Sequence, residues 1–145
     1  MAQAFRLQPL LALTDQRLDA ATAELHRLRA RLDQERDRYD QLQGFNAEYA
    51  AGLQQALSSG LEAHRLRDYR QFLDKLSRAI ATQAAEVQRC QRTWEEALRR
   101  WHDLRQRQQA LEVLRTRHLT AEAQRETRIE QKQHDEFARR EGKRE

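Results

Sequence analysis

The chain has 145 residues, of which 34% are charged and 6% aromatic, and its formal net charge is +4. With four glycines and one proline, it is not suited to a compact globular domain and favours long helices with few turns. No apolar run approaches the roughly 18 residues that a bilayer span requires, and a single cysteine cannot form a disulfide within the chain. We therefore expect a soluble, cytoplasmic protein.

The first predicted helix covers about residues 9–57. Pro9 suits its first turn, where the missing N–H group costs no hydrogen bond. Residues then repeat at alternating spacings of three and four, which is typical of a helix that buries one narrow seam against a partner helix. Beyond Leu42 this rhythm loosens, and Gly44 and Gly52 weaken the helix. The predicted seam positions are Leu11, Thr14, Leu18, Ala21, Leu25, Leu28, Leu32, Glu35, Tyr39 and Leu42.

A turn is predicted at about residues 58–61. Ser58, Ser59 and Gly60 form the one turn signal in the middle of the sequence. Ser59 is followed three residues later by Glu62, the spacing of a capping box that would start the second helix. A short break between two long helices with matching seams indicates an antiparallel hairpin.

The second predicted helix covers about residues 62–140. Its seam keeps the same rhythm as far as Leu111, which lies opposite the start of the first helix if the turn centres near residues 59 and 60. We expect the pairing to end there and the rest of the helix to overhang. The sequence thus predicts an all-α, single-domain coiled-coil hairpin over residues 1–145, rather than a parallel dimer. The predicted seam positions are Leu66, Tyr69, Leu73, Leu76, Ile80, Gln83, Val87, Cys90, Trp94, Ala97, Trp101, Leu104, Gln108 and Leu111.

Residues that could carry catalysis do not cluster in this sequence. His102, His118 and His134 recur every sixteen residues, too far apart along a helix to share a metal ion. No glycine-rich phosphate loop occurs, and a two-helix hairpin offers no pocket that would exclude water. We expect no enzymatic activity, catalytic residue, metal, cofactor or small-molecule substrate.

The positive net charge lies wholly within residues 74–145. A basic second half could meet nucleic acid, an acidic membrane surface or an acidic protein cavity. Interspersed aspartates and glutamates argue against nucleic acid, because they repel phosphates along the same face. A solvated helix face remains an alternative.

Two stretches are candidates for protein docking. The first is an aromatic group around Phe45, Tyr49 and Phe72, which either fills a coiled coil splayed by the glycines or forms a docking patch. The second is residues 125–140, RETRIEQKQHDEFARR, which contain too few apolar residues to hold them on this chain. They are either a solvated tail or a helix that a ring or groove receives.

Four segments resemble the flagellar FliJ family: GFNAEYAAGL (44–53), DYRQFLDKLSRAI (68–80), EEALRRWHDLRQRQQALEVL (95–114) and RIEQKQHDEFARR (128–140). The tetrapeptide DEFA, residues 135–138, is the most specific of these motifs. The order and spacing of the segments together make the resemblance strong.

This resemblance implies a non-enzymatic component of the flagellar type III export apparatus, similar to the central stalk of rotary ATPases. The implied partners are the hexameric export ATPase and its regulator, the membrane export-gate protein and export chaperones, which the protein helps to recycle. The implied location is the cytoplasmic face of the inner membrane at the flagellar base. Nucleic acid is not among the expected partners.

The resemblance also assigns residues to two surfaces. Those implied to bind the export gate are Leu42, Phe45, Tyr49, Phe72, Leu76 and Ala79. Those expected to bind the ATPase ring are Arg125, Arg128, Lys132, Asp135, Glu136 and Phe137. In the gate-binding group, Phe45 stands where a tyrosine is common in the family, and nearby Gln83 stands where a histidine can occur.

Other functions remain open at this stage. The protein could be the equivalent stalk of a virulence-type injectisome, an unrelated cytoplasmic coiled-coil scaffold, or a nucleic-acid-binding hairpin whose affinity falls steeply with salt. A hairpin that delivers catalytic carboxylates into an enzyme channel would need paired acids at its tip. Residues 50–60 contain none.

Overall fold

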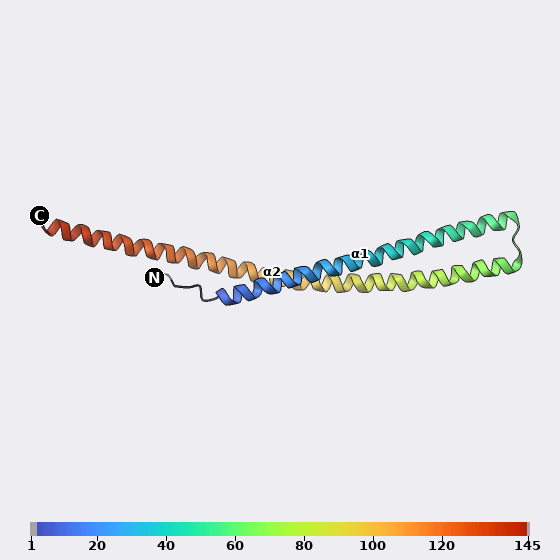
Figure 1. Ribbon diagram of the computed structural model, residues 1–145, viewed down its shortest axis with the longest axis horizontal. Helices are drawn as coiled ribbons and strands as arrows, with labels where there is room; N and C mark the ends of the chain where they lie inside the picture. Colours follow the sequence, from blue (N-terminus) through green and yellow to red (C-terminus); the bar gives the residue numbers. More distant parts are fainter. Residues whose placement is uncertain (1–2, 145) are drawn as a thin grey trace. The chain divides into compact units, whose positions relative to one another are not determined.

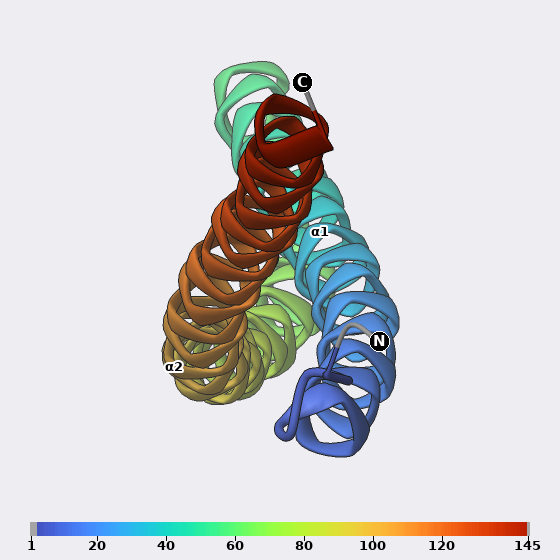
Figure 2. The same ribbon diagram turned by 90° about the vertical axis from the view of Figure 1, so that its left-hand side faces the viewer.

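The computed structural model describes residues 3–144 as two long helices joined by a short turn (Figure 1). Helix α1 is Gln8–Ser59 and helix α2 is Ala63–Arg144, and they run in opposite directions. The predicted all-α class and the pairing of two long helices in a hairpin are therefore confirmed. Helix α2 is drawn as one unbroken helix in Figure 2, and it ends at Arg144, a few residues past the expected end near residue 140.

The contacts of the chain fall into two compact units. One contains the residues up to Ala20 together with those from Trp101 onward, and the other is Ala21–Arg100. Each unit pairs a segment of α1 with a segment of α2. Neither helix, over its described residues, contains a stretch long and apolar enough to cross a membrane.

In the unit Ala21–Arg100, every predicted seam position is buried or half-buried. The core there includes Leu28 and Leu32 of α1 and Cys90 and Ala97 of α2. Trp94 is half-buried, and the guanidinium of Arg29 lies 5.1 Å from the centre of its ring. Because the spacing of three and four keeps one stripe facing the partner helix, the sequence pattern and the observed core coincide.

The other unit also follows the predicted seam, and its pairing extends further than expected. The segment before α1 lies along α2, with the ring of Phe5 5.7 Å from that of His118. The backbone N–H of Gln3 donates to Oε2 of Glu122 at 3.2 Å, and its carbonyl oxygen lies 2.8 Å from Nε2 of His118. The helix-on-helix seam ends at Leu111 as predicted, but the sequence did not predict that the non-helical segment before α1 continues the contacts along α2.

The turn differs in detail from the expected capping box. Gly60 has a φ of 88°, a conformation that glycine adopts at little cost, and it follows the last residue of α1. The hydroxyl of Ser59 donates to the carbonyl oxygen of Gln55 at 3.2 Å, within α1. The capping-box prediction is wrong, because α1 includes Ser59 and its hydroxyl bonds to the preceding turn of that helix.

Candidate protein-docking surfaces

Three aromatic side chains form an exposed cluster in the unit Ala21–Arg100. Phe45, Tyr49 and Phe72, here called the aromatic cluster, are 49%, 43% and 42% exposed. The rings of Tyr49 and Phe72 have centroids 4.4 Å apart and are tilted by 44°, a favourable geometry for two aromatic rings. Since Tyr49 belongs to α1 and Phe72 to α2, this contact joins the two helices. The cluster depends on how the helices are aligned.

The other three residues assigned to the gate-binding group lie at different depths. Leu76 is buried and Leu42 is half-buried, since both occupy seam positions. Ala79 is exposed. A partner that docks here would therefore touch the aromatic rings and Ala79, whereas Leu76 supports that surface from within.

A shallow groove of about 360 Å³ adjoins the aromatic cluster, and sequence reasoning did not identify it. It contains Gly52, where an added Cβ atom would meet no heavy atom within 4 Å. The spacing of the α1 residues is the signal that could have revealed it, because residues three and four apart share one face of a helix. The residues that line the groove are Phe45, Glu48, Tyr49, Gly52 and Tyr69.

Gln83, a predicted seam residue, faces the partner helix. Its Nε2 donates to Oε2 of Glu35 at 2.6 Å and to the backbone oxygen of Glu35 at 2.9 Å. The Glu35 carboxylate also contacts Arg31 and Arg38, each at 3.1 Å from its Oε1. Among residues 3–144, no buried side-chain nitrogen or oxygen lacks a hydrogen-bond partner.

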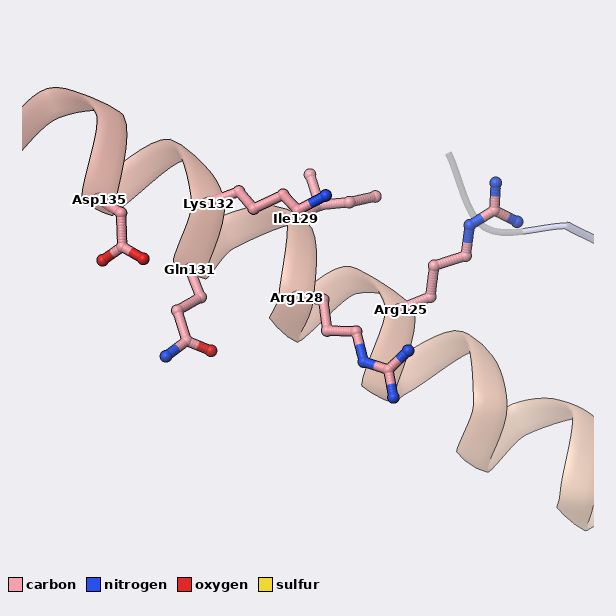
Figure 3. Close-up of a pocket in the computed structure, with 6 residues that line it drawn as sticks. All are labelled: Arg125, Arg128, Ile129, Gln131, Lys132 and Asp135. Atoms are coloured by element: carbon pink, nitrogen blue, oxygen red, sulfur yellow. The ribbon is translucent and has the colours of Figure 1, made fainter.

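The end of α2 is a second, chemically different surface. Every residue from 123 to 144 is exposed, including all six that were assigned to the ATPase ring. Phe137 is 64% exposed, and Ile129 is exposed as well. Figure 3 shows six side chains of this segment projecting from α2, with Lys132 extending beside Ile129 and Asp135 lying apart from the cationic groups. A helix with this mixture of charge and apolar side chains can bind a protein surface but lacks an enclosed site.

Ion pairs along the helices shift the pKa values of two carboxyl groups. A hydrogen bond from Arg27 lowers the pKa of Glu24, and one from Arg89 lowers the pKa of Glu86. Both are exposed pairs three residues apart on one helix, and such pairs give modest support to the helix. The described residues contain no group of three side chains that could hold a metal ion.

Comparison with known proteins places this sequence beside one family along nearly its whole length. The family model described as "Flagellar FliJ protein" matches residues 3–145. The flagellar FliJ proteins of Salmonella typhi and Escherichia coli (strain K12) are each 30% identical to it over 140 residues. The aligned region covers 97% of this chain and 95% of each relative. No solved structure matches it.

Proposed function

This chain belongs to the flagellar FliJ protein family and is a non-catalytic component of the flagellar export apparatus, and from that premise we propose that it acts as a stalk between the export ATPase and the membrane export gate. In this proposal the uncovered end of α2 binds the hexameric ATPase and stimulates it. The aromatic cluster binds the export-gate protein. The protein also contacts the ATPase regulator and takes part in recycling export chaperones, at the cytoplasmic face of the inner membrane.

The observation that carries this proposal is the exposure of α2 from residue 123 to residue 144. Isolated helices are marginally stable in water, so a helical end of this length gains stability when a partner surrounds it. Its charges have both signs and its large apolar side chains are few and separated. Such a surface supports many shallow contacts around the helix, as a ring with a central opening would provide.

The aromatic cluster supports the second half of the proposal. Exposed aromatic side chains that lie together are typical of protein interfaces and contribute much of their binding energy. Phe45, Tyr49 and Phe72 are large apolar groups close to half exposed, beside a shallow groove. We infer that they bind the gate protein more tightly than the charged end of α2 binds the ATPase.

The proposal is tested by the turnover of the purified export ATPase with and without this protein. We expect the full chain to stimulate turnover, and the double variant Arg128→Glu, Lys132→Glu to lose most of that stimulation, because it reverses charge on the uncovered end. The matched control is Arg65→Glu with Arg67→Glu, which reverses two exposed arginines near the turn and should stimulate as the original chain does. Equal stimulation by both double variants, or none by the original chain, would contradict the proposal.

A further inference from the structure

Glu35 is a charged residue at a position where the coiled coil would otherwise place an apolar side chain. Its side chain is 2% exposed, and it follows the fully buried Leu32 in the seam. Burial of a carboxylate is unfavourable unless hydrogen-bond donors surround it. Here Oε1 forms an ion pair with Arg31 and accepts from Arg38, and Oε2 accepts from Gln83. The buried carboxylate therefore has partners for both oxygens. Two apolar side chains at positions 35 and 83 would nevertheless stabilise the fold at least as well.

The donors of Glu35 differ in their dependence on helix alignment. Arg31 and Arg38 lie on α1, four residues before and three after Glu35, so they stay near it however α2 is placed. Among the described residues, Gln83 is the donor from α2, and its amide reaches both the side chain and the backbone oxygen of Glu35. This pair, called the polar layer, forms in one alignment of the helices.

The apolar seam positions around this pair, in the unit Ala21–Arg100, do not distinguish alignments as sharply. Because it repeats every seven residues, sliding one helix by seven residues again places apolar side chains opposite one another. Glu35 would then lie opposite Leu76 or Cys90 instead of Gln83. Both are buried, and neither replaces the amide as a donor, since a leucine has none and a thiol is a weak one. The slide leaves a buried carboxylate oxygen without its partner.

We propose that Glu35 and Gln83 are positioning residues that fix the register of α1 on α2. The register in turn places Tyr49 of one helix against Phe72 of the other. The seam near these rings is irregular and Gly44 and Gly52 weaken α1 there, so the local packing alone would not hold the two helices in this alignment. The expected effect on gate binding rests on the proposed function of the aromatic cluster. The effect of the polar layer on the helix register is independent of that function.

The test measures register directly in the full-length chain. Spin labels are attached to cysteines that replace Ala50 and Arg92, two exposed residues on opposite helices and at different levels, with Cys90→Ala in all samples. Pulsed electron paramagnetic resonance then reports the distance between the labels. The double variant Glu35→Leu, Gln83→Leu keeps the seam apolar and removes the polar layer.

We expect one narrow distance in the reference chain. The double variant should keep its helicity and melt at the same or a higher temperature, yet show a broadened distribution or added populations, because a slide of seven residues moves a helix by about 10 Å along its axis. Gln108→Leu is the matched control. It removes another seam glutamine, which bonds the half-buried Asp15 at 2.8 Å in the other unit, and it should leave the distance narrow.

The proposal is overturned if the double variant gives the same single narrow distance as the reference chain. If that variant does not fold, Gln83→Leu alone decides, since it removes only the α2 donor, and an unchanged narrow distance would again contradict the proposal. Binding to the export-gate protein is measured in parallel and should weaken in the double variant. Absence of gate binding by the original chain would refute the docking role and leave the register result intact.

Discussion

At the scale of single residues, neighbouring side chains at the aromatic cluster differ in whether they stabilise the fold or are exposed to a partner. Leu76 is buried in the seam, whereas Phe72, one helical turn earlier, keeps 42% of its surface exposed. The sequence alone left open whether the aromatic rings fill the coiled coil or dock a partner. The structure shows them at the surface, with Tyr49 and Phe72 packed on one another.

The variant Phe72→Ala tests this distinction. It removes one ring of an exposed pair, so we expect a loss of about 1 kcal/mol in the free energy of unfolding, little change in helicity and a marked loss of gate binding. Circular dichroism and binding to the purified gate protein measure these effects. Phe137→Ala, which removes another exposed phenylalanine, should leave gate binding unchanged. A loss of helicity as large as that of Trp94→Ala would assign Phe72 to the core instead.

Individual side chains also show what sequence reasoning could not predict. Spacing placed Gln83 in the seam but did not reveal that its amide donates to the side chain and the backbone oxygen of Glu35, 48 residues away in the sequence. The hydroxyl of Ser59 could either cap the start of α2 or bond to the preceding turn of α1. It bonds to the Gln55 carbonyl oxygen because α1 extends through Ser59. Neither detail follows from spacing, because each is decided by a single local or long-range hydrogen bond.

At the scale of the elements, periodicity predicted most of the structure. Apolar residues at alternating spacings of three and four lie on one face of a helix. This spacing predicted both helices, the seam positions and the antiparallel pairing. The segment from Gln3 to Leu7 was missed because it is not helical and shows no repeat. Its placement along α2 comes from contacts such as that between Phe5 and His118.

Two glycines within α1 provide a test at this scale. A methyl group at residue 44 or 52 would meet no heavy atom within 4 Å. Gly44→Ala and Gly52→Ala should therefore each raise the free energy of unfolding by about 1 kcal/mol, since alanine loses less backbone entropy in a helix. Urea denaturation measures this gain.

The same two variants distinguish an effect on the free energy of unfolding from an effect on gate binding. Gly52 lines the groove beside the aromatic cluster and Gly44 does not, so only Gly52→Ala should weaken gate binding. Gly142→Ala, in the exposed end of α2, should change neither quantity. A stabilised Gly52→Ala variant with undiminished gate binding would show that the groove is not part of the docking surface.

At the scale of the whole chain, the two candidate surfaces use different chemistry. The aromatic cluster offers large apolar groups that can anchor a partner, and the end of α2 offers dispersed charges with few apolar side chains. Because the chain belongs to the flagellar FliJ protein family, both surfaces belong to a component of the flagellar export apparatus. We propose that the export ATPase binds the exposed end of α2, residues 123–144.

Amide hydrogen exchange of the full chain, alone and with saturating export ATPase, tests this claim most directly. Alone, residues 123–144 should exchange much faster than the seam residues 101–111, because no tertiary contact protects an exposed helical end. With the ATPase, residues 123–144 should become strongly protected, and the double variant Arg128→Glu, Lys132→Glu should lose that protection. Unchanged exchange of residues 123–144 in the presence of saturating ATPase would contradict the account.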